Sequence, residues 1–152
     1  YTLSPTAIAG EHILAERLFG EPDREWSFNP TPKAVFFTQP LASVMLTEEE
    51  ATRDHDLDIF ASTFTPMLQT LSGRKDKVLM KLVVDAHSNV VLGAHMVGPD
   101  SPEIIQGLAI AVTAGLKKRD FDRTIGLHPT SAEEFVTMRS RTRYVPSASG
   151  TV

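Results

Sequence analysis

The strongest constraint on the fold is a pair of strand-like runs, 77–85 and 90–97, that are joined by a turn of only four residues. A connection this short joins antiparallel neighbours, because parallel strands need a crossover of a dozen or more residues. The sequence therefore predicts a β-hairpin in the middle of the chain. His87 falls in its turn and His95 in its second strand, and both are expected to be structural residues. Gly93 predicts a bulge or a close backbone approach within the second strand.

Other segments carry local signals for helices and strands. Ser4 and Pro5 predict an N-cap followed by a proline at the first helical position, and Thr47 and Glu50 stand at capping-box spacing. Helices are predicted over 4–18, 47–54 and 102–114, further strands over 34–38, 43–46 and 56–64, and polar connections over 21–32 and 70–76. This order of helices and strands predicts an α+β domain with a mainly antiparallel sheet packed against helices.

The length of 152 residues suits one domain with one sizeable core. Residues 1–143 are expected to form this domain. Residues 144–152, which are rich in Pro, Ser and Gly, are expected to be a disordered tail. The chain begins at Tyr1 rather than at methionine, which suggests a processed chain or an excised fragment.

The predicted helix over 102–114 is apolar around most of its circumference. Its apolar residues are Ile104, Ile105, Leu108, Ala109, Ile110, Ala111 and Val112. A small domain has little room to bury a helix on several sides. Two interpretations stay open: a central core helix, or a helix whose outer side is covered by a second copy of the chain. Gly107 and Ala114 are among the small residues that would allow close helix–helix approach.

Composition excludes several classes of function. The net charge is -4 at pH 7, and Lys and Arg are scattered apart from 117–119 and Arg139, Arg141 and Arg143, which are expected to be solvated. The chain has no cysteine, which excludes a disulfide, a thiolate nucleophile and a cysteine metal site within it. The five histidines show no paired ligand spacing, so no metal site is predicted. Because the basic residues are scattered, nucleic acid is not an expected partner. The sequence shows no apolar run of about 20 residues and no signal-peptide pattern, so a membrane is not an expected partner and a cytoplasmic location is expected.

The most informative stretch runs from Gly126 to Arg139 and joins a histidine to a short predicted helix. Pro129 restricts the backbone of His128, so the imidazole is expected on a stiff elbow. Thr130 and Glu133 stand at capping-box spacing, which predicts a helix start. The same spacing permits Glu133 or Glu134 to hydrogen-bond a ring nitrogen of His128 for acid–base chemistry. The spacing alone leaves both interpretations open.

Several stretches, in the right order, resemble the carboxy-terminal interface (dimerisation) domain of the glutathione reductases, which are FAD-dependent pyridine nucleotide-disulfide oxidoreductases. They are Leu3 to Pro5, Val44 to Ala51, Leu71 to Arg74, Leu79 to Asp85, His95 to Gly98, Pro102 to Gly107 and His128 to Glu134. The resemblance covers nearly everything from Leu3 to Arg139. The motif that begins at His128 is similar to the one in the family's disulfide reductases.

The resemblance implies that this chain is one piece of a flavoenzyme, with the FAD- and NADPH-binding domains and a reactive cysteine pair elsewhere in the parent protein. His128 would protonate the departing glutathione thiolate and Glu133 would orient it, both supplied across a homodimer to the partner's site. Leu3, Ser4 and Pro5 would place a helix amino end at the FAD, near which His128 and Pro129 would also lie. The helix over 102–114 would lie at the subunit interface. The chain alone would bind no cofactor and would be inactive.

Two alternatives accompany this resemblance. In the first, the chain would be a stand-alone dimerisation or scaffold module without catalysis. In the second, it would be the same domain of a related disulfide reductase of the trypanothione reductase type. One position departs from the family pattern, since Met45 stands where the family usually has glycine. A glycine there would suit a positive φ or a close backbone approach, so Met45 is expected to strain the strand or alter its packing.

Overall fold

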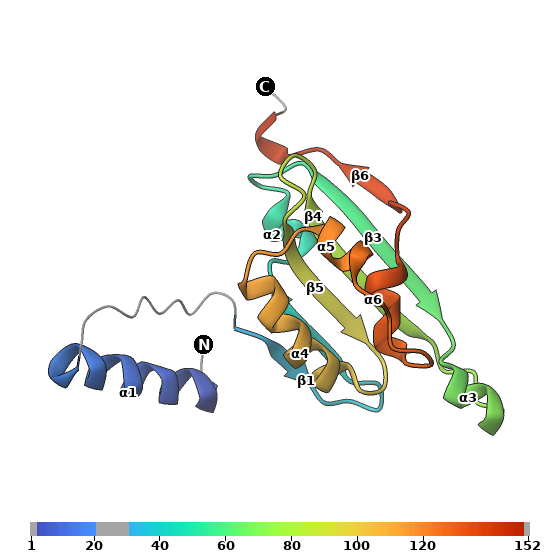
Figure 1. Ribbon diagram of the computed structural model, residues 1–152, viewed down its shortest axis with the longest axis horizontal. Coiled ribbons are helices and arrows are strands. Elements are labelled where there is room, and N and C mark those ends of the chain that lie inside the picture. The colour runs from blue at the N-terminus through green and yellow to red at the C-terminus, as the bar shows by residue number, and fades with distance from the viewer. Residues whose placement is uncertain (1–2, 21–30, 151–152) are drawn as a thin grey trace. The chain divides into compact units, whose positions relative to one another are not determined.

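The computed structural model describes residues 3–20 and 31–150, which belong to two compact units, Tyr1–Thr31 and Pro32–Val152. The predicted connection over 21–32 lies almost wholly outside the described residues. In the first unit, α1 spans Ser4–Phe19 (Figure 1). Its N-cap is Leu3, whose carbonyl oxygen accepts the amides of Thr6 and Ala7 at 3.0 Å. The predicted Ser4 cap is wrong by one residue, because Leu3 already supplies the first helical acceptor.

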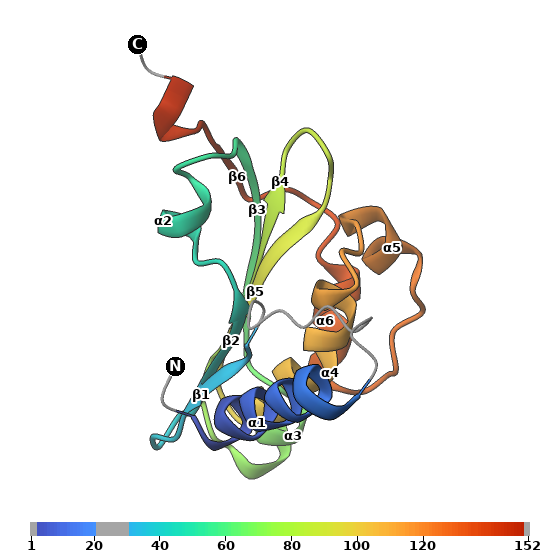
Figure 2. The same cartoon turned by 90° about the vertical axis from the view of Figure 1, so that its left-hand side faces the viewer.

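The second unit is built on one antiparallel sheet of six strands in the order β1-β2-β5-β4-β3-β6. The strands are β1 Lys33–Val35, β2 Leu41–Met45, β3 Leu57–Phe64, β4 Val78–Asp85, β5 Val91–Val97 and β6 Arg143–Val145. The helices are α2 Glu48–Ala51, α3 Met67–Ser72, α4 Ser101–Thr113, α5 Lys118–Arg123 and α6 Glu134–Thr137, with short 3-10 turns at Ser131–Glu133 and Ala148–Gly150. Figure 2 shows α4, α5 and α6 on one face of the sheet and α2 on the other. The predicted α+β fold with a mainly antiparallel sheet is confirmed.

The core lies mainly between the sheet and α4–α6. Strand residues Met80, Leu82 and Met96 pack there with Ile105 of α4 and Phe135 of α6, and all five are buried. A smaller cluster under α2 joins Ala51, Leu57, Ile59 and Val83. The sheet is therefore buried on both faces near the end of β4, where Leu82, Val83 and Val84 are all buried.

The hairpin formed by β4 and β5 is present as predicted, with His87 in its turn and His95 in its second strand. Nε2 of His95 lies 3.1 Å from the carbonyl oxygen of Leu46. Burial lowers the pKa of His95, and the nearby positive charge of Lys81 lowers it further. The register of the β4–β5 pair shifts beside Gly93, so the predicted bulge and close approach both occur there.

Met45 has φ 64°, in the left-handed region, and pairs directly with Gly93 of β5. Met45, which the resemblance places where a glycine is expected, thus occupies a backbone conformation that glycine adopts without cost and other L-residues adopt at about 1–2 kcal/mol. The capping box of Thr47 and Glu50 is also present, with both reciprocal hydrogen bonds, but α2 ends at Ala51, before the predicted residue 54.

Two segments differ from the sequence prediction. Met67–Ser72 forms α3, which overlaps the predicted loop over 70–76 and ends at Gly73 in the left-handed conformation. Tyr144 and Val145, predicted to lie in a disordered tail, instead belong to β6 and pair with β3. Both elements depend on tertiary contacts, because six-residue helices and three-residue strands have little stability by themselves.

Candidate active-site loop and its groove

The histidine motif forms a stiff turn between α5 and α6. The His128–Pro129 peptide bond is cis, and Thr130 caps the 3-10 turn Ser131–Glu133, which continues directly into α6. The amide of Glu133 donates to Oγ1 of Thr130 at 3.3 Å. The predicted helix start at Thr130 is therefore present.

Glu133 does not complete the capping box with its side chain. Its Oε1 and Oε2 lie 3.0 and 3.3 Å from Nδ1 of His128. Because a carboxylate only accepts, Nδ1 donates the proton and Nε2 is the ring nitrogen not engaged by the carboxylate. The His128 side chain is 68% exposed and that of Glu133 25% exposed. Glu133 therefore orients a histidine ring that is largely open to solvent.

The position of Glu133 is fixed by its neighbours in the chain. Phe135 and Met138 are buried in the main core directly after it. A Cβ placed on Gly126 would lie 2.9 Å from Cβ of Glu133, so the loop leading to His128 runs close against the base of the glutamate. The pair of His128 and Glu133, here called the dyad, therefore lies between two segments that are held in place by packing.

Glu134, the second acidic candidate, does not reach His128 by any recorded hydrogen bond. Its Oε2 accepts from Oγ1 of Thr137 at 3.3 Å. The structure therefore selects Glu133 over Glu134 as the partner of the histidine.

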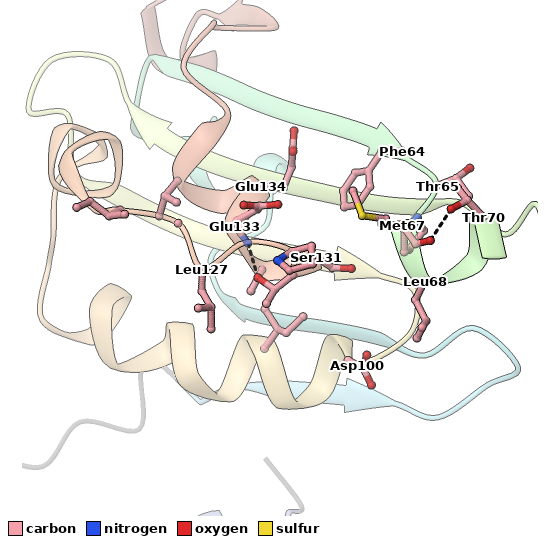
Figure 3. Close-up of a pocket in the computed structure, with 18 residues that line it drawn as sticks. Phe64, Thr65, Met67, Leu68, Thr70, Asp100, Leu127, Ser131, Glu133 and Glu134 are labelled. Carbon is pink, nitrogen blue, oxygen red and sulfur yellow. Dashed lines mark hydrogen bonds between the residues drawn. The ribbon is translucent and has the colours of Figure 1, made fainter. Parts of the chain in front are cut away.

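A groove of about 890 Å³ lies beside the histidine motif and is lined by Glu133, although His128 itself is not among its lining residues. Figure 3 shows its lining, which comes from the end of β3 and α3 on one side and from the histidine loop on the other. Leu68 and Leu127, at its margins, are 80% and 75% exposed. Asp100, Glu133 and Glu134 supply the carboxylates that border it. Sequence reasoning missed the groove, because no helix was predicted where α3 forms its wall.

Three of the remaining predicted site residues lie in the other compact unit. Leu3, Ser4 and Pro5 form the start of α1, and no acidic side chain lies in the first turn of that helix. A helix amino end without an acidic neighbour carries partial positive charge that suits an electron-rich group. Pro129 stands beside His128 at the turn.

Residues 3–20 and 31–150 contain no group of three or more His, Cys, Asp or Glu side chains placed to hold a metal ion. In the same residues, every helix is too short or too polar to cross a membrane.

Comparison with curated proteins finds disulfide reductases. The chain is 50% identical over 144 residues to "Glutathione reductase, chloroplastic/mitochondrial" of Pisum sativum and 47% identical over 140 residues to "Glutathione reductase" of Nostoc sp.. It is 42% identical over 141 residues to "Trypanothione reductase" of Leishmania donovani. These matches cover 94%, 90% and 91% of this chain but only 26%, 30% and 29% of the relatives. The chain thus spans less than a third of the proteins it matches.

The fold comparison agrees. A copper(II) complex of a mutant of the HOCl-induced flavoprotein disulfide reductase RclA from Escherichia coli matches with a TM-score of 0.76 and 25% identity. This match covers 94% of this chain and 33% of that chain. Residues 31–139 match the family described as "Pyridine nucleotide-disulphide oxidoreductase, dimerisation domain". The chain belongs to the pyridine nucleotide-disulphide oxidoreductases, and residues 31–139 carry the dimerisation domain of that family.

Proposed function

We propose that this chain is the dimerisation domain of an FAD-dependent, NADPH-using glutathione-disulfide reductase, and that it supplies His128 and Glu133 to the active site of the partner subunit. The observation that carries the proposal is the 3.0 Å hydrogen bond between Nδ1 of His128 and Oε1 of Glu133. Together with the exposed ring, it leaves Nε2 oriented for proton exchange with a bound substrate.

The chemistry that suits this geometry is protonation of a leaving thiolate. A thiolate elsewhere in the enzyme attacks one sulfur of the substrate disulfide, a new S–S bond forms, and the old bond breaks with its electron pair on the departing sulfur. Nε2–H of protonated His128 donates its proton to that sulfur, and Glu133 balances the charge of the imidazolium while holding the ring in place. Because this chain contains no cysteine, the attacking thiolate belongs to another part of the parent protein.

FAD, when bound in the parent enzyme, would carry reducing equivalents from NADPH to the cysteine pair. The residues of this chain proposed to face it are Leu3, Ser4 and Pro5 at the start of α1, with His128 and Pro129. The amino end of α1 fits that role, because it presents helix-dipole charge and has no acidic side chain in its first turn. In the proposal neither cofactor is held by the isolated chain.

Self-association is proposed to use α4. The helix buries Ile105, Ala109 and Val112 on its sheet side, while Ile110 on its outer side is 73% exposed. A Cβ on Gly107 would meet nothing within 4 Å, so packing within this chain does not require glycine there. An exposed isoleucine beside a glycine suits close packing against a helix of a second copy.

Two alternatives differ from this proposal in substrate or role. The 42% identity to a trypanothione reductase supports the same domain in an enzyme for a related disulfide. A scaffold module would pair through α4 without any need for the His128–Glu133 geometry. The cytoplasmic location stays a prediction, and the name of the pea relative points to organelles instead.

The test is a chimera in which residues 31–139 replace the matching domain of the Pisum sativum glutathione reductase. We expect NADPH-dependent reduction of glutathione disulfide, lowered by roughly 10²- to 10⁴-fold by His128→Ala. His87→Ala is the matched control, because His87 also pairs with a carboxylate, at 3.0 Å from Asp56, and is exposed. A dimeric, FAD-loaded chimera with full activity after His128→Ala would reject the catalytic role. Faster turnover of trypanothione disulfide than of glutathione disulfide would favour the alternative substrate.

A further inference from the structure

The chain continues in ordered form beyond residue 139, where the match to the dimerisation-domain family ends. Residues 140–148, here named the C-terminal strap, run along the outer edge of β3. Strand β6 within the strap pairs antiparallel with Leu57, Asp58 and Ile59. Figure 1 shows β6 at the border of the sheet, beside β3. The strap therefore forms the last strand of the sheet.

Backbone hydrogen bonds extend the contact beyond β6 at both ends. The amide of Thr142 donates to the carbonyl of Ile59 at 2.8 Å, and the amide of Ala148 donates to the carbonyl of Thr52 at 2.7 Å. The hydroxyl of Thr142 accepts from the amide of Ala61 at 2.9 Å. The strap thus satisfies polar backbone groups that an uncovered edge strand leaves open to another chain.

Charged side chains fasten the strap to the domain. Nη1 of Arg141 lies 2.7 Å from Oδ1 of Asp58, and Arg143 forms an ion pair with Glu48 at 2.5 Å. The carboxylate of Asp56 accepts the amide of Ser147 at 2.7 Å. The two arginines of the strap thus pair with acidic residues of β3 and α2, and the turn between those elements binds a backbone amide of the strap.

One apolar contact adds to these polar ones. Val145 packs against the buried cluster that contains Leu57, Ile59 and Val83. The side chains of Leu57 and Ile59 are 0% and 1% exposed. The strap therefore covers the apolar residues at this edge as well as their backbone.

We propose that the β3 edge is a strand-addition site that the strap occupies within its own chain. Occupied in this way, the edge is closed to other chains, and copies of the protein associate through α4 alone. The strap fits this edge because it is extended, places Arg141 and Arg143 against Asp58 and Glu48, and places Val145 against the apolar cluster. When the strap is absent, the occupant is the β3 edge of a second copy. The unpaired amides and carbonyls of one exposed edge can then hydrogen-bond with those of an identical, antiparallel edge.

The test compares the whole chain with a chain that ends at Arg139, each carrying Ile110→Glu to suppress pairing through α4. We expect the whole chain to sediment as a monomer and the shortened chain to form concentration-dependent dimers or larger species. A synthetic peptide of residues 140–150 should return the shortened chain to monomer. The same peptide with Arg143→Glu and Val145→Asp should not. A folded, monomeric shortened chain, or equal rescue by both peptides, would overturn the proposal.

A second measurement uses the whole chain, so it does not depend on the shortened chain folding. Arg141→Glu combined with Arg143→Glu should speed hydrogen exchange of the Ala61 amide by at least about tenfold, because that amide donates to the strap. Arg139→Glu, an exposed change just before the strap, is the matched control and should leave it unchanged. Equal exchange in all three proteins would show that the charged residues do not hold the strap.

Discussion

Gly93 stands so close to Leu46 that a Cβ on Gly93 would lie 2.1 Å from the Leu46 carbonyl oxygen. That atom belongs to the backbone, so side-chain rotation cannot relieve the clash. We expect Gly93→Ala to lower the free energy of unfolding by about 3 kcal/mol, measured by urea denaturation. Gly107→Ala is the control: its Cβ has open space in α4, and helix propensity should raise stability by up to about 1 kcal/mol. Equal effects of the two substitutions would contradict this account.

Asp85 should contribute a pH-dependent part of the stability. Burial acts to raise its pKa, but hydrogen bonds from the amide and hydroxyl of Ser88, from His55 and from the amide of His87 outweigh it, and the pKa falls to about 2. Because the pKa in the folded chain lies below the ordinary value of 3.8, this stability is present above pH 3.8 and is lost as pH falls toward 2. It amounts to about 2 kcal/mol.

Urea denaturation of Asp85→Asn at neutral and acidic pH tests this prediction. The variant should be less stable at pH 7 and should lose less of its stability on acidification than the parent chain. Asp76→Asn, at an exposed carboxylate 3.9 Å from Arg74, is the control and should follow the parent. An Asp85→Asn chain with the acid sensitivity of the parent would place that sensitivity elsewhere.

Lys118 is 1% exposed, and its ammonium lies 4.4 Å from the ring centroid of Phe60 and pairs with Asp122. We expect Lys118→Ala to cost about 2–4 kcal/mol, because it leaves a cavity under α5. Lys118→Met refills the space of the lysine stem and should cost less than about 1.5 kcal/mol. Thermal or urea unfolding of both variants decides the matter. If the methionine chain is as unstable as the alanine chain, the charge contacts outweigh packing at this site.

Ile110→Glu should convert a dimer of the chain into a monomer without lowering the stability of the folded monomer, since the side chain is 73% exposed. Sedimentation equilibrium over a wide concentration range measures the association constant, and circular dichroism checks the fold. Leu116→Glu is a control on another exposed apolar side chain, just after α4, and should leave pairing intact. Loss of pairing in the control but not in Ile110→Glu would move the interface away from α4.

Glu133 should select the tautomer of His128 even in the isolated chain. At alkaline pH, nitrogen-15 NMR of the ring should report the proton on Nδ1, the atom that faces the carboxylate. Glu133→Gln should shift the population toward the Nε2–H form, because a glutamine amide can also donate. Glu134→Gln, the adjacent change, should have no effect. An unchanged tautomer in Glu133→Gln would mean that the hydrogen bond does not orient the ring in solution.

Local spacing determined much of the fold. The four-residue connection between two apolar runs allowed only a hairpin, and Thr47 and Glu50 formed the capping box that their separation predicted. The order of helices and strands was enough for the α+β class. Each of these features depends on residues close together in the chain, so the sequence carries the whole of the physical cause.

At the candidate site, spacing brought Thr130, His128 and Glu133 together but did not distinguish a capping box from a histidine dyad. Both need the same separation, and only the packing of α6 turns the carboxylate toward His128. The helix α3, which forms one wall of the groove, could not be predicted from the sequence for a related reason. A six-residue helix is stable only where tertiary contacts hold it.

The strap shows the limit most clearly. In the sequence, Arg141 and Arg143 precede a tail rich in Pro, Ser and Gly and carry no local signal for a strand. Their partners Asp58 and Glu48 lie far earlier in the chain, and only the folded sheet brings these charges together. The sequence alone determined the central hairpin, the capping box of Thr47 and Glu50, and where the histidine motif begins. The tertiary structure decided which edge the tail covers and which atom of His128 faces outward, because those choices depend on contacts between residues that the chain itself keeps apart.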